Sequence, residues 1–123
     1  MSKHCRKIFE QYTSGFSMKG YLGLTFTNSE GEQVPITPEE FNLFVEQVAA
    51  VFPDGFTIYD AVGGFSFEGQ TFIEPTKVLE VVAAKRGFRK SLRKFEALIE
   101  AYTIEFHQTS QFITVNKVQF LAK

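Results

Sequence analysis

The sequence predicts a single α+β domain of the ferredoxin-like class, in the order β-α-β-β-α-β. Two segments carry apolar residues at the three- and four-residue steps of amphipathic helices, and four segments are rich in β-branched and aromatic residues. The 123 residues suffice for one core. Because short connections join these segments, we predict a four-stranded antiparallel sheet with two helices on one face.

The first twenty residues carry apolar side chains at helical spacing, which Gly15 and Gly20 interrupt. They predict a short helix or ordered arm over residues 1–20, followed by the ferredoxin-like domain over residues 21–123. The first strand is predicted at residues 21–26, where apolar residues alternate with Tyr, Gly and Thr.

Both helices have clear sequence signals. Thr37 as N-cap, Pro38 at the first helical position and Glu40 three residues after the cap predict a helix start with a capping box. This helix is expected to stop at Pro53. The second helix is predicted over residues 88–106, where apolar positions alternate steps of four and three.

The remaining strands follow from short runs of β-formers. Residues 56–67 predict one strand, with a bulge or bend at Gly63 and Gly64. Residues 72–82 predict its hairpin partner, and residues 112–121 predict the last strand.

Composition excludes several classes of protein. The net charge of -1 gives no global electrostatic reason to bind nucleic acid or an anionic membrane. Cys5 is the only cysteine, so an intrachain disulfide and a cysteine zinc site are excluded, which fits a reducing compartment. His4 and His107 are not at ligand spacing, and no long apolar run occurs. We therefore expect a cytoplasmic protein without membrane association, metal or cofactor.

A set of polar, glycine and aromatic residues has a recognisable order and spacing: Phe52-Pro53-Asp54-Gly55, Thr57, Asp60, Gly63, Glu74-x-x-Lys77-Val78-Leu79, Ile99-x-x-Tyr102, Phe106 and Gln108-x-Ser110. This pattern resembles an uncharacterised bacterial family described only as a domain of unknown function, over residues 22–120. The resemblance implies the ferredoxin-like fold and brings no activity. The chain departs from it at Phe65, where the family carries Trp, and at residues 85–87, which replace a loop of Pro and acidic residues.

A basic segment, residues 85–94, opens the second helix. It holds six of the thirteen basic residues, namely Lys85, Arg86, Arg89, Lys90, Arg93 and Lys94. Cations four residues apart repel, and cations in a first helical turn oppose the macrodipole, each costing about 0.3 kcal/mol or more. One interpretation is a solvated helix face balanced by neighbouring acids. The other, on which we base the functional prediction, is a non-enzymatic binding protein that engages a nucleotide, a phosphate, a nucleic-acid backbone or an acidic protein partner.

Four polar residues of the family pattern support an alternative function. Asp60, Glu74, Lys77 and Tyr102 could form a ligand-binding pocket between sheet and helices, as in a cofactor-independent enzyme. They could instead be structural, with ion pairs at a sheet edge and a bonded core phenol. No residue is assigned as catalytic, and a small protein-interaction or inhibitor module is the third alternative.

The second face of the predicted sheet is also apolar. Phe56, Ile58, Phe65, Phe67, Val78 and Val82 could supply this surface. Because apolar sheet faces are covered in soluble proteins, the pattern predicts a homo-oligomer formed by sheet-to-sheet packing.

Overall fold

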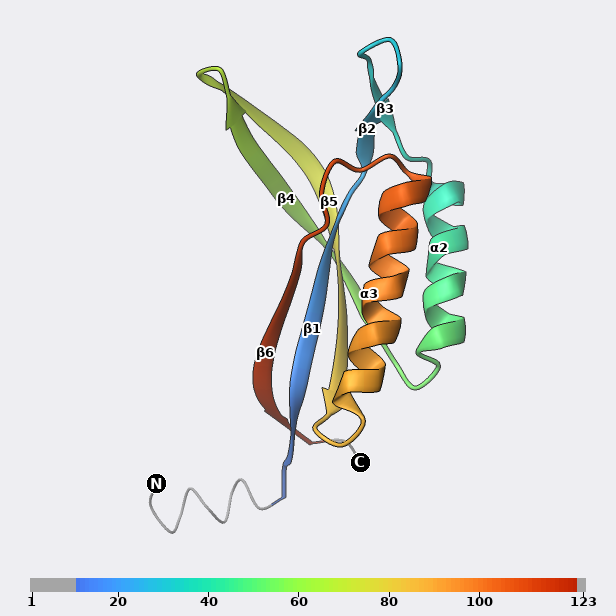
Figure 1. The fold of residues 1–123 in the computed structure, drawn as a ribbon, viewed down its shortest axis with the longest axis vertical. Helices are drawn as coiled ribbons and strands as arrows, with labels where there is room; N and C mark the ends of the chain where they lie inside the picture. Colours follow the sequence, from blue (N-terminus) through green and yellow to red (C-terminus); the bar gives the residue numbers. More distant parts are fainter. Residues whose placement is uncertain (1–10, 122–123) are drawn as a thin grey trace.

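The computed structural model describes residues 11–121 and has the predicted ferredoxin-like architecture (Figure 1). The elements are β1 (Thr13–Gly23), β2 (Thr25–Thr27), β3 (Gln33–Pro35), α2 (Pro38–Val51), β4 (Thr57–Phe67), β5 (Gln70–Ala84), α3 (Phe88–Glu105) and β6 (Ile113–Phe120). The main sheet has the order β4-β5-β1-β6, and every neighbouring pair is antiparallel. The short β2–β3 hairpin, which was not predicted, is inserted between β1 and α2.

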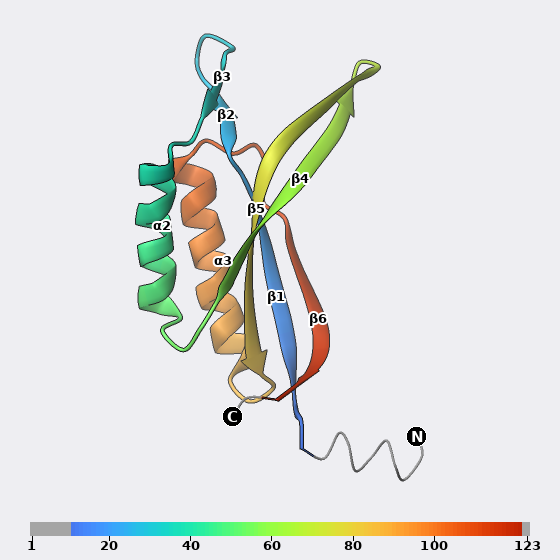
Figure 2. The ribbon, with the colours of Figure 1, turned by 180° about the vertical axis from the view of Figure 1, so that it is seen from behind.

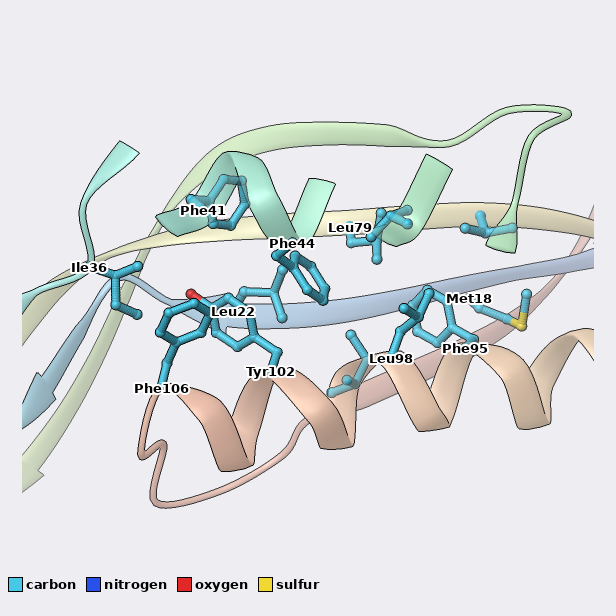
Figure 3. Packing of buried hydrophobic residues seen from close by; sticks show 13 residues of the cluster. Met18, Leu22, Ile36, Phe41, Phe44, Leu79, Phe95, Leu98, Tyr102 and Phe106 are labelled. Atoms are coloured by element: carbon cyan, nitrogen blue, oxygen red, sulfur yellow. The ribbon is translucent and has the colours of Figure 1, made fainter. Parts of the chain in front are cut away.

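Both helices cover one face of the sheet, and the core lies between the two layers (Figures 1 and 3). The largest fully buried side chains in this core are Tyr102, Phe44, Phe95, Met18, Leu22, Leu79, Ile99 and Val48. Tyr102 is central, with ring centroids 4.9 Å from Phe44 and 4.8 Å from Phe106. This layer therefore contains the amphipathic stripes that predicted the two helices.

The start of α2 confirms the predicted capping box. The Thr37 hydroxyl accepts a hydrogen bond from the Glu40 amide at 3.1 Å, and the Thr37 amide donates to the Glu40 carboxylate at 3.1 Å. Pro38 occupies the first helical turn, where its missing N–H costs nothing. Local sequence chemistry thus fixes where this helix begins.

Residues 13–19 correct one prediction, because they form the first part of β1 rather than a helix or arm. The predicted boundary at residue 20 therefore lies inside a strand, and residues 1–10 of the predicted arm lie outside the described range. Gly20, interpreted as a helix interruption, is a strand position under α3. A Cβ atom there would lie 2.4 Å from the end of the Ile99 side chain, so the close approach of helix and strand favours glycine.

The glycine pair of β4 corrects a second prediction. The ladder with β5 runs without a bulge through Gly63, paired with Glu74, and Gly64, paired with Ile73. The two strands continue beyond Gly23, where pairing with β1 ends. The free end of this hairpin leans away from the helices in both views (Figures 1 and 2).

Candidate functional site

A cavity of about 440 Å³ lies on the face of the sheet opposite the helices. It is bounded by the end of β1, the β4–β5 hairpin and the connection from α3 to β6. Its lining residues are Tyr21, Gly23, Ala61, Val62, Gly63, Gly64, Phe65, Glu74, Thr76, Gln108, Thr109, Ser110 and Phe112. A volume of this size suits a small organic molecule.

The chain turn after α3 places Gln108 in the cavity wall. His107 has a left-handed backbone, with φ of 51°, and the Gln108 amide donates back to the Thr103 carbonyl at 3.0 Å. This bond has the six-to-one pattern of a Schellman helix end, which turns the chain sharply. The Gln108 side chain then donates to the Thr25 carbonyl at 3.0 Å and lies against Gly23.

Two glycines make the floor of the cavity. A Cβ atom on Gly23 would lie 2.4 Å from the Gln108 amide oxygen and 3.4 Å from a Glu74 carboxylate oxygen. A Cβ atom on Gly63 would lie 2.8 Å from the Thr76 hydroxyl. The glycines that looked like bend positions in the sequence therefore make room for polar side chains.

Among residues 11–121, Glu74 is the only charged residue in the cavity lining. One oxygen of its carboxylate accepts a hydrogen bond from the Thr25 hydroxyl at 3.0 Å, which holds the side chain in place. The other polar side chains in the lining, including Thr76, Gln108 and Ser110, are neutral. The cavity therefore has a net negative charge and favours cationic groups and hydrogen-bond donors.

Aromatic rings also line the cavity, on its β1–β6 side and on its hairpin side. The rings of Tyr21 and Phe112 are 5.3 Å apart and tilted by 60°, and both line the cavity. On the hairpin side, Phe65 stacks on Phe72 with centroids 5.1 Å apart. Such rings offer flat apolar surface and can also attract a cation over their faces.

Tyr102, a predicted ligand-binding residue, reaches the back of the floor from the core. Its hydroxyl donates to the Gly23 carbonyl at 2.6 Å, and the side chain is 1% exposed. Burial raises the pKa of Tyr102 well above its ordinary range, and the negative charge of Glu74 raises it further. Tyr102 thus supports the cavity floor from behind as a neutral phenol.

The structure separates the four predicted pocket residues. Asp60 and Lys77 are cross-strand neighbours that form an ion pair. Lys77 is in register with the core residue Leu22, which places it on the helix-covered side of the sheet. Glu74 lies on the opposite side, so the four do not converge between sheet and helices, where core side chains fill the space. Ligand binding by Asp60 and Lys77 stays a prediction.

The basic segment is exposed along its whole length: Lys85, Arg86, Arg89, Lys90, Arg93 and Lys94 all face solvent. Within residues 11–121 the only ion pair joins Lys77 and Asp60, so none of these six cations forms an ion pair there. The helix begins after Gly87 without a side-chain cap and has no acidic residue in its first turn. Lys85 also lines a hollow of about 410 Å³, together with Lys117.

Most residues that line the cavity were not predicted from the sequence to belong to a functional site. Tyr21 and Phe112 were predicted only as strand residues and Phe65 as part of an oligomer surface, because nothing local marks a ring on a cavity wall. Gln108 and Ser110 were present in the family pattern, together with Glu74 and Gly63. Their shared occurrence in that pattern was the one signal that could have grouped them.

Across the described range, no three His, Cys, Asp or Glu side chains gather closely enough to hold a metal ion. In the same range, every helix is too short or too polar to cross a lipid bilayer.

Comparisons with known proteins identify a matching family and solved structures with a similar fold. A family model described as "Protein of unknown function (DUF3574)" matches residues 18–120. The structure is similar to a phage SAM lyase in its apo state, with 17% identity, a TM-score of 0.56, and coverage of 89% of this chain and 91% of the lyase chain. The same lyase type in complex with S-methyl-5'-thioadenosine gives 17% identity, a TM-score of 0.56, and coverage of 88% and 90%. No curated protein sequence matches significantly.

Proposed function

The chain belongs to the DUF3574 family of proteins of unknown function, and we propose that its Glu74 cavity binds a small molecule that carries a positive charge beside a flat ring. The observation that carries this proposal is the single carboxylate of Glu74 among the rings of Tyr21, Phe65 and Phe112. A cation near a carboxylate and over aromatic faces gains from both interactions.

S-adenosylmethionine is the probe that this chemistry favours. Its sulfonium carries the positive charge, and its adenine is the flat ring. The fold similarity to a phage SAM lyase, one form of which holds S-methyl-5'-thioadenosine, supports the choice of this probe. The ligand class is therefore a sulfonium nucleoside, and Glu74 is the residue expected to distinguish charged from neutral sulfur.

Binding without turnover is the simpler form of this proposal. The cavity lining offers one titratable carboxylate, with neutral hydroxyl and amide groups around it. General acid–base catalysis usually requires groups placed to give and take a proton at the reacting atoms. A cofactor-independent enzyme in this cavity is the alternative, and it would release a nucleoside product.

Isothermal titration calorimetry tests the proposal with two matched ligands. S-adenosylhomocysteine retains the nucleoside and amino acid of S-adenosylmethionine but has a neutral sulfur. We expect the wild-type chain to bind S-adenosylmethionine about tenfold more tightly, or by about 1.4 kcal/mol, because only its sulfonium is attracted by the Glu74 carboxylate. Equal affinities, or no binding of either ligand, would refute the proposal. Chromatography of the mixture then separates binding from turnover.

The basic segment supports a second candidate function, the binding of a nucleic-acid backbone, a nucleotide or an acidic protein. Six exposed cations without ion-pair partners in the described range favour it, since unbalanced cations in a first helical turn are unfavourable. We expect the double variant Arg89→Glu/Arg93→Glu to lose most affinity for a fluorescent single-stranded oligonucleotide. The salt dependence of the remaining binding should also fall. Unchanged binding and salt dependence would contradict this function.

A further inference from the structure

The free end of the β4–β5 hairpin, residues 62–73, is here named the arm. It presents large apolar side chains to solvent on both of its faces: Val62 is 76% exposed, Phe65 56%, Phe67 61%, Phe72 37% and Ile73 67%. Glu68 is its only charged residue. Apolar surface of this kind, gathered on one protruding element, marks an interaction surface.

The backbone edges of the arm are also open. β4 is an outermost strand of the sheet, so its outer edge has no partner strand among residues 11–121. Pairing of β5 with β1 stops at Thr76, so the part of β5 within the arm has no second neighbour in the sheet. Natural sheet edges are usually protected by lysine, proline or a bulge. Residues 62–73 contain neither lysine nor proline, and their ladder is regular.

We propose that two copies of this chain associate through their arms. A strand edge is self-complementary about a twofold axis, because an antiparallel copy of the same strand matches its hydrogen-bonding groups. The same contact would bring apolar side chains of the two copies into cross-strand contact on both faces of the arm. A second copy of the chain can therefore pair with the open strand edge and also contact the exposed apolar side chains.

The exposed area of the arm agrees with what a dimer needs. With roughly 200 Å² for a whole phenylalanine side chain and somewhat less for valine and isoleucine, the five apolar side chains expose about 500 Å² per copy. Two arms together then supply about 1,000 Å², which is the lower bound for a stable interface.

This interface differs from the sheet-to-sheet packing expected from the sequence. Val78 is 2% exposed, between the register positions of Tyr21 and Tyr59. Phe56 and Ile58 pack against the core on the helix side. Of the predicted surface, Phe65 and Phe67 are in the arm. Because Phe65 also lines the cavity, association of the arms would fix one cavity wall.

Sedimentation velocity of the full chain over a range of concentrations tests the proposal. We expect a dimer for the wild type and a monomer for Phe67→Glu and Ile73→Glu, with unchanged circular dichroism spectra. Leu43→Glu is the matched control, since Leu43 is 61% exposed on α2, away from the arm. It should leave the dimer intact. If one arm variant fails to fold, the other carries the test.

Three results would overturn the proposal. They are a wild type that is monomeric at every concentration, folded arm variants that still dimerise, and a control that dissociates as readily as the arm variants. Cosedimentation of a monomeric wild type with phosphatidylcholine vesicles, lost in Phe67→Glu, would show that the arm binds a lipid surface instead.

Discussion

Replacing Glu74 by glutamine is expected to weaken S-adenosylmethionine binding by about 10- to 100-fold, because it removes the attraction between carboxylate and sulfonium. For charges about 4 Å apart near a protein surface this attraction is about 4 kcal/mol, and desolvation of the two charges offsets part of it. Glutamine has nearly the same shape and can still accept the Thr25 hydrogen bond. The cavity should therefore keep its form and lose only its charge. Calorimetric titration of wild type and variant measures the change.

The structure offers a matched control for this variant. Glu80 lies on the same strand and the same face as Glu74, outside the cavity, and accepts a hydrogen bond from Ser17 at 2.5 Å. Glu80→Gln should leave the affinity unchanged. Binding of neutral S-methyl-5'-thioadenosine should change little in either variant. If Glu74→Gln binds S-adenosylmethionine as well as the wild type does, Glu74 only anchors Thr25.

Truncating Tyr102 to alanine is expected to lower the free energy of unfolding by about 3–5 kcal/mol, because a large aromatic side chain is lost from a packed core. Tyr102→Phe should cost about 1–2 kcal/mol, since it leaves the Gly23 carbonyl without its buried donor. Urea denaturation followed by circular dichroism measures both values. The same changes at Tyr59, which is 40% exposed, should cost far less.

The stability difference between wild type and Tyr102→Phe should depend on alkaline pH. The folded-state pKa of Tyr102 is raised above its ordinary value of 10.0. The unfolded chain therefore releases this proton first, and the wild type loses stability as pH rises above 10. Phenylalanine has no such proton, so the difference should shrink in that range. A constant difference would mean that burial does not perturb this phenol.

The fold could be predicted largely because its signals are local. The Thr37–Glu40 capping box and the apolar stripe of α3 each define an element without help from distant residues. The prediction of the N-terminal helix or arm was wrong over residues 13–19 because Gly20 has two interpretations. As a helix interruption it is a local signal, but its actual role, contact with Ile99, depends on tertiary packing.

The cavity could not be predicted, because strand register and one chain turn create it. Glu74 and Lys77 are three residues apart on a strand, so their side chains point to opposite faces, and sequence reasoning grouped them in one pocket. Gln108 reaches Gly23 only because His107 adopts a left-handed conformation, which is uncommon for histidine. Neither the strand register nor the turn at His107 produces a periodic pattern in the sequence.

The position of Gly23 would couple ligand binding in the cavity to the packing of the core. Its carbonyl holds the core phenol of Tyr102, and its missing side chain makes room for Gln108 on the other side. At this point only one peptide separates the interior from the cavity. A molecule bound on this floor would contact the aromatic cluster through that peptide, so we expect cavity occupancy to change the rigidity of the core. The amide hydrogen-exchange rates of α3 around Tyr102 would therefore be expected to change when the cavity is occupied.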